Sequence, residues 1–99
     1  MTTARLPFDT SRLIEICRAN DVAMVGVFGS MARGEATAQS DIDLLVRFSK
    51  NKSLLALVAL EREISTALDR RVDLLTEAAI SPYIRARVKS ELEVIYETT

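Results

Sequence analysis

The spacing of apolar residues predicts a helix followed by a buried strand in the first third of the chain. Over residues 9–20 apolar positions recur every three or four residues, and Asp9 precedes them as a candidate N-cap. Residues 22–28 then form a nearly continuous apolar run that ends at a glycine, the pattern of a strand buried on both faces. The inward face of the helix is expected to consist of Leu13, Ile14 and Cys17.

The rest of the chain alternates between helix and strand patterns. A short helix is expected to start at Ser30, and Ser53 and Ser81 are candidate N-caps of two later helices. The last helix has Pro82 at its first position. It is expected to bury Ile84 and Val88. Strands are expected over residues 40–48 and 71–76, and long helical patterns over residues 51–70 and 82–90. Residues 94–96 fit either an edge strand or a docked tail. This order predicts an α/β (α+β) fold, a small mixed sheet flanked by helices, in a single domain of residues 1–99.

Composition narrows the chemistry that such a domain can perform. Hydrophobic residues make up 48% of the chain, and 13 basic against 14 acidic residues leave a formal charge of -1. A disordered chain and a protein that holds nucleic acid mainly by electrostatics are therefore both disfavoured. The chain has no histidine, and Cys17 is its single cysteine, which excludes Ser-His and Cys-His nucleophiles, internal disulfides and zinc sites. Any catalysis is left to carboxylates, hydroxyls, arginine, lysine and the backbone.

No segment of the sequence suggests a membrane location. None approaches the ~18 to 20 consecutive apolar residues that a membrane span requires. The first residues also lack the apolar stretch of a secretory signal. The expected compartment is therefore the cytoplasm.

Two aspartates open the second predicted strand. Asp41 and Asp43 are two residues apart, so on a strand both project to one side of the sheet. Adjacent carboxylates repel each other unless a cation lies between them, and Mg²⁺ prefers one or two carboxylates together with phosphate oxygens. The pair fits a metal site, although a solvated polar face of a strand would have the same pattern.

Ten residues separate a preceding Gly-Ser pair from the first of these aspartates. Gly29 permits a positive φ or a close approach of the backbone, and Ser30 adds a hydroxyl at the start of the short helix, where N–H groups attract anions. Arg33 fits a contact with a phosphate or an ion pair with Glu35. Asp73, in the third apolar strand, fits a third carboxylate ligand or an ion pair with a neighbouring arginine, Arg70 or Arg71.

The string GSMARGEATAQSDIDLLV resembles the nucleotidyltransferase signature of the DNA polymerase β superfamily. The chain is similar over nearly its whole length to the small single-domain form, the minimal nucleotidyltransferase (MNT), and the ending ISPYIRARVKSELEVIYE is similar to MNT C-termini. This resemblance implies the polymerase β-like fold and nucleotide binding by Gly29 and Ser30, to which we add Arg33. It also implies that Asp41, Asp43 and Asp73 are the catalytic residues and ligands of two Mg²⁺ ions.

The resemblance further implies an AMP-transferring enzyme that uses ATP. Many MNT proteins are antitoxins paired with a HEPN-domain toxin, an RNase, and transfer AMP to a tyrosine hydroxyl of that toxin. Two alternatives stay open: an antitoxin that neutralises its partner by binding alone, and a nucleotidyltransferase for a small hydroxylated molecule. Apolar surface for a partner is expected at Leu55, Leu60 and Tyr96.

Overall fold

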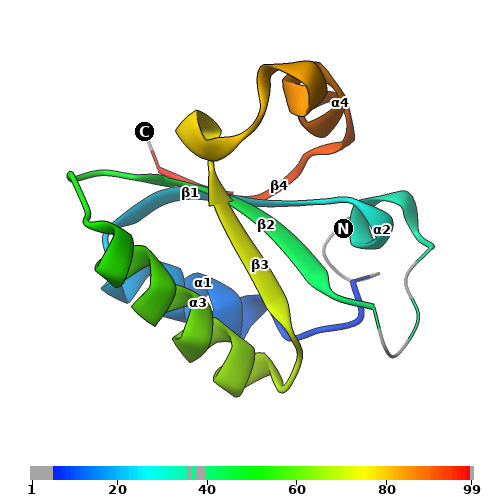
Figure 1. Cartoon of the computed structure of the whole chain (residues 1–99). Helices are drawn as coiled ribbons and strands as arrows, with labels where there is room; N and C mark the ends of the chain where they lie inside the picture. Colours follow the sequence, from blue (N-terminus) through cyan, green and yellow to red (C-terminus); the bar gives the residue numbers. More distant parts are fainter. Residues whose placement is uncertain (1–5, 36, 38–39, 99) are drawn as a thin grey trace.

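The computed structural model describes residues 6–35, 37 and 40–98, and its strands form one mixed sheet (Figure 1). The strand order is β3-β2-β1-β4, with β1 antiparallel to both of its neighbours and β2 parallel to β3. The expected mixed sheet flanked by helices is thereby confirmed, and the last apolar segment is an edge strand rather than a docked tail. The strands are β1 (Val22–Phe28), β2 (Ile42–Phe48), β3 (Val72–Thr76) and β4 (Glu93–Glu97).

Helices cover both faces of this sheet (Figure 1). Helices α1 (Thr10–Ala19) and α3 (Leu54–Leu68) lie side by side on one face, and α3 provides the crossover between the parallel strands β2 and β3. Helix α4 (Pro82–Glu91) and the short η2 (Glu77–Ala79) lie on the other face. The four-residue helix α2 (Ser30–Arg33) follows directly after β1.

The helix starts expected from capping residues are confirmed. The Asp9 side chain accepts a hydrogen bond from the Arg12 N–H at 3.0 Å, and the Ser53 hydroxyl accepts one from the Ala56 N–H at 3.1 Å. Ser81 caps α4 in the same way. Each cap satisfies an N–H group that the first turn of a helix otherwise leaves without a partner. Strand β2 begins at Ile42, so Asp41 precedes the strand instead of lying within it as expected.

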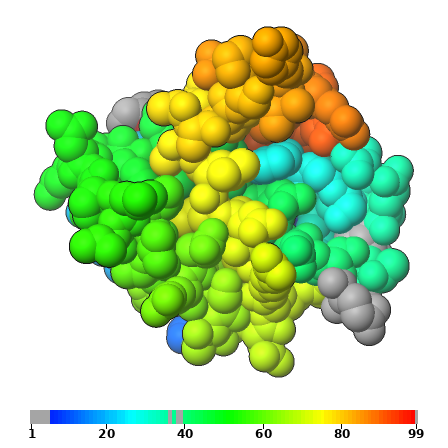
Figure 2. Space-filling view, viewed as in Figure 1, coloured from blue at the N-terminus to red at the C-terminus, as the bar shows by residue number. Residues whose placement is uncertain are grey.

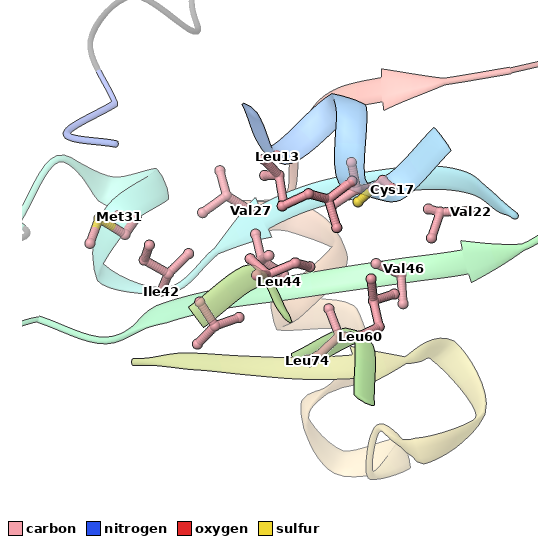
Figure 3. Close-up of a cluster of buried hydrophobic side chains, with 14 of the residues drawn as sticks. Leu13, Cys17, Val22, Val27, Met31, Ile42, Leu44, Val46, Leu60 and Leu74 are labelled. Atoms are coloured by element: carbon pink, nitrogen blue, oxygen red, sulfur yellow. The ribbon is translucent and has the colours of Figure 1, made fainter. Parts of the chain in front are cut away.

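The larger core cluster fills the space between the sheet and helices α1 and α3 (Figure 3). Alternate residues of the central strands point into it, because successive strand side chains point to opposite faces. The smaller cluster, on the other face, contains Met24, Leu45, Ile80 and Val88. The larger cluster includes Leu13, Cys17, Val27, Leu44, Val46, Leu60 and Leu74.

The expectations for Leu60 and Ile84 are wrong, and those for Ile14 and Tyr96 hold only in part. The inward face of α1 contains Ile16, with Ile14 only half-buried. Leu60 is 2% exposed and belongs to the core, whereas Leu55 is 81% exposed as expected. Tyr96 packs partly against the core. Ile84 of α4 is 45% exposed, so Val88 alone of that helix is buried.

Among the residues that the structure describes, no helix combines the length and the apolar character needed to cross a membrane.

Candidate active site

The turn between β1 and α2 depends on Gly29. Its backbone has φ 75° and ψ -149°, a conformation that essentially only glycine adopts. A Cβ atom built on Gly29 would collide with the Oδ2 atom of Asp43. The backbone of the turn therefore lies directly against this carboxylate. Gly29 is also the N-cap of α2, so no N-cap side chain bonds the first N–H groups of this helix.

Asp43 and Asp73 meet at the same end of the sheet. Asp43 is the second residue of β2, paired with Phe28 at the end of β1 on one side and with Asp73 of β3 on the other. The two carboxyl groups are therefore neighbours across the parallel pair of strands. Since they alternate with the core residues of their strands, both lie on the face that also carries α4.

The surroundings of Asp43 disfavour its negative charge. Burial, followed by the carboxylates of Asp73 and Asp41, raises the pKa of Asp43, and Arg33 only partly opposes this effect. A bound cation would offset the repulsion among these carboxylates. An all-oxygen set of carboxylates is also the donor type that Mg²⁺ prefers. The Asp43–Asp73 pair therefore fits a divalent cation.

Asp41 stands apart from this pair. It precedes β2, its side chain is 43% exposed, and its Oδ2 atom lies 3.7 Å from the Nε atom of Arg71. Its charge still contributes to the raised pKa of Asp43. Within the described part of the chain, no group of three or more aspartate, glutamate, cysteine or histidine side chains is arranged as a metal site. The structure thus brings two of the three candidate carboxylates together and holds the third beside an arginine.

Arg33 is held between two carboxylates. Its Nε atom donates to Glu35 at 2.9 Å, the ion pair considered from the sequence, and its Nη1 atom lies 3.1 Å from both carboxylate oxygens of Glu91 in α4. Arg33 is close enough to Asp43 to lower the pKa of that carboxyl. It therefore lies beside the glycine turn and the aspartates, with an additional partner that the sequence did not suggest.

Arg70 contacts the loop that leads to Asp41. Its Nη2 atom donates to the backbone carbonyls of Thr37 at 2.9 Å and Ser40 at 2.8 Å. Sequence reasoning considered Arg70 and Arg71 only as ion-pair partners of Asp73. In the described structure Arg71 faces Asp41, and Arg70 supports the backbone before Asp41. No local pattern in the sequence distinguishes the roles of these two adjacent arginines.

A pocket of about 190 Å³ lies next to the glycine turn. Its walls come from the end of β1, from α2 and from α4, and they combine apolar and charged side chains. Figure 2 shows α4 (orange) standing beside the cyan surface of the β1–α2 region. The pocket is lined by Phe28, Gly29, Arg33, Ile84, Arg87, Val88 and Glu91.

Comparison with known proteins agrees with this geometry. The family model of the nucleotidyltransferase domain matches residues 10–95. The chain is 41% identical over 71 residues to the protein adenylyltransferase MntA of Thermococcus cleftensis, covering 72% of each protein. It is 41% identical over 80 residues to a Methanocaldococcus jannaschii protein that bears the name protein adenylyltransferase, covering 81% of this chain and 86% of that one.

A solved structure shares the fold. It is a crystal structure of a toxin–antitoxin with AMP-PNP, which superposes with a TM-score of 0.80 at 25% identity and covers 92% of this chain and 75% of that chain. Its architecture matches the mixed sheet and the flanking helices described above. The chain therefore belongs to the nucleotidyltransferase domain family and, within it, to the family of protein adenylyltransferases that includes MntA.

Proposed function

We propose that this enzyme transfers AMP from ATP to a tyrosine hydroxyl of a partner HEPN-domain toxin and so acts as the antitoxin of a toxin–antitoxin pair. The observation that carries the proposal is the meeting of Gly29, Asp43 and Asp73 at one end of the sheet. The MntA relative and the toxin–antitoxin structure with AMP-PNP support the choice of acceptor and nucleotide. We propose the cytoplasm as the compartment, because ATP is available there.

The proposed roles follow from the position of each residue. The N–H groups and hydroxyl at Gly29 and Ser30 bind phosphate oxygens of ATP, and the Arg33 guanidinium contributes positive charge beside them. Asp41, Asp43 and Asp73 would hold two Mg²⁺ ions, which supply neutralisation of the triphosphate and a lower pKa of the attacking hydroxyl. Asp41 would then exchange its contact with Arg71 for the ion.

The reaction is an in-line substitution at the α-phosphorus of ATP. The tyrosine oxygen forms a bond to this phosphorus, and the bond from the phosphorus to the bridging oxygen breaks, so that pyrophosphate leaves with the electron pair. Asp73 is the proposed acceptor of the hydroxyl proton. The acceptor tyrosine remains linked to AMP through a phosphodiester. No histidine or cysteine is required, which agrees with a chain that has no histidine and a single buried cysteine.

The proposal is tested with the product of the neighbouring gene as the candidate toxin, Mg²⁺ and ATP labelled at the α-phosphate. We expect label on a tyrosine of the toxin, loss of the toxin's RNase activity, and no transfer by the Asp41→Ala/Asp43→Ala variant. If this variant neutralises the toxin fully and wild type transfers no label, the protein is an antitoxin that acts by binding. Label on an added small hydroxylated molecule but not on the toxin would assign the third alternative.

A further inference from the structure

Glu91, the last residue of α4, contacts Arg33 of α2. Glu91 accepts hydrogen bonds from the Arg33 guanidinium, with 3.1 Å from Nη1 to each carboxylate oxygen. Arg87, one helical turn earlier, lies 3.3 Å from the same carboxylate. The Glu91 side chain is only 18% exposed. A single carboxylate therefore connects helix α4 to Arg33 of the proposed nucleotide site.

These contacts restrict the direction of Arg33. The guanidinium is planar and carries its donors in a fixed fork, so two bound carboxylates define its orientation. Glu35 occupies Nε and Glu91 occupies Nη1, and among the described residues no hydrogen bond uses Nη2. One donor nitrogen of an oriented guanidinium thus remains for a ligand beside the turn.

The charges around Glu91 favour its ionised form. Burial opposes ionisation, but hydrogen bonds from Arg87 and Arg33, together with the Gly29 N–H, outweigh it and hold the pKa of Glu91 below its ordinary range. Arg33 and Arg87 balance the charges of Glu35 and Glu91. The four charges cancel, and Arg33, Arg87 and Glu91 line the pocket of about 190 Å³ next to the turn.

We propose that Glu91 is a positioning residue for the nucleotide: it orients Arg33 toward the phosphates of ATP. This inference rests on the proposed function, because it requires nucleotide at Gly29 and Ser30. The alternative is that Glu91 inhibits nucleotide binding, because its carboxylate occupies donors that would otherwise bind the phosphates of ATP. The two roles predict opposite effects on nucleotide affinity.

Binding of a fluorescent ATP analogue in the presence of Mg²⁺ and without the toxin distinguishes these roles. Glu91→Gln keeps the size of the side chain and removes its charge, and we expect about a 10-fold weaker affinity, in the range of one lost charge-assisted hydrogen bond. Arg33→Ala should weaken binding similarly. Addition of Glu91→Gln to Arg33→Ala should cause no further loss, because Glu91 acts through Arg33.

The matched control is Glu97→Gln. Glu97 pairs with Arg47 at 3.3 Å at the other end of β4, away from the turn, so its affinity for the nucleotide should stay within twofold of wild type. If Glu91→Gln does not fold, Glu91→Asp retains the charge on a shorter side chain and should still bind more weakly than wild type. Tighter binding by either Glu91 variant, an unchanged affinity of a folded Glu91→Gln, or additive losses in the double variant would overturn the proposal.

The binding measurement also separates this inference from the proposed function. Nucleotide affinity is measured without an acceptor, so wild-type protein that binds ATP but labels no toxin would refute AMP transfer and still test Glu91. Conversely, full label transfer with normal affinity in Glu91→Gln would refute the positioning role and leave the proposed function intact.

Discussion

Gly29 is constrained in two independent ways. Its φ of 75° and ψ of -149° lie in a region that side-chain-bearing residues avoid, and the space where a Cβ would lie is filled by the Asp43 carboxylate. Gly34, at the other end of α2, has a similar φ of 73°, but nothing lies within 4 Å of the position of its Cβ. Gly34 therefore has only the positive φ, whereas Gly29 has both the positive φ and the close contact with Asp43.

Substitution of these glycines is expected to have different consequences. Gly34→Ala should cost only the left-handed strain of about 1–2 kcal/mol in the free energy of unfolding and leave nucleotide binding unchanged. Gly29→Ala should add displacement of Asp43 to a strain of about 1–3 kcal/mol and reduce nucleotide affinity at least 10-fold. Urea denaturation and nucleotide titration measure both effects. Equal nucleotide affinities for the two variants would contradict the close approach of Gly29 to Asp43.

Cys17 is a core residue whose thiol resists ionisation. It is fully buried between α1 and the sheet, and burial, followed by the charge of Glu63, raises the pKa of its thiol from 9.0 to about 12. The thiolate is the reactive form, so the folded protein should react very slowly with thiol reagents. This agrees with its interpretation from the sequence as a packing residue rather than a nucleophile.

The raised pKa of Cys17 also predicts a dependence of stability on pH. Below about pH 9 the thiol is protonated in both the folded and the unfolded chain, and its contribution to the free energy of unfolding is constant. As the pH rises toward 12, only the unfolded chain ionises and this contribution is lost. Native protein at pH 8 should react with an aromatic disulfide reagent at least 100-fold more slowly than protein in urea. Equal rates would show that Cys17 is accessible in the folded state.

At the scale of elements, the ends of the helices were more predictable than their buried faces. Caps are local, so Asp9, Ser53 and Ser81 could be identified from residues two or three positions away. Helix α3 carries apolar residues around much of its circumference, and such a pattern does not determine which side meets the sheet. Packing selects the side with Leu60 and Ile64 and leaves Leu54 74% exposed and Leu55 81% exposed.

Two leucines of α3 provide a matched test of this packing. Leu60→Ala removes methyl groups from the core and should lower the free energy of unfolding by about 2–5 kcal/mol. Leu55→Ala changes an exposed side chain of the same type in the same helix and should change it by less than about 0.5 kcal/mol. Chemical denaturation followed by circular dichroism compares the two. A larger loss for Leu55→Ala would require a different orientation of α3.

The candidate site shows the same division between local and distant information. Gly29, Ser30 and the aspartates were identified because their spacing along the chain has chemical meaning. Asp73 could be placed near Asp43 only on the condition that β3 lies beside β2, which the β-α-β crossover through α3 fulfils. The contact between Arg33 and Glu91 joins residues 58 positions apart. No local pattern predicts such a pair, because it depends on how α4 packs over the sheet.

In the molecule as a whole, one face of the sheet carries the larger core and the other carries the candidate site. The face with α1 and α3 carries the larger core, whereas the face with α4 carries the smaller one and, at one end, the aspartates and the glycine turn. The strands are thus fixed by packing on one face while their polar residues are presented on the other. This separation allows site residues to be changed with little effect on the main core.

Asp73 provides the most direct test of the proposed active site. It is distant in sequence from the Gly-Ser and Asp-Ile-Asp motif, and only the pairing of β3 with β2 places it beside Asp43. The decisive measurement is the initial rate of AMP transfer from α-labelled ATP to the partner toxin by Asp73→Asn, with Glu97→Gln as the control at the far end of the sheet. We predict at least a 100-fold lower rate for Asp73→Asn, with unchanged circular dichroism, and a rate within twofold of wild type for the control. A folded Asp73→Asn protein that transfers AMP at the wild-type rate would contradict the account.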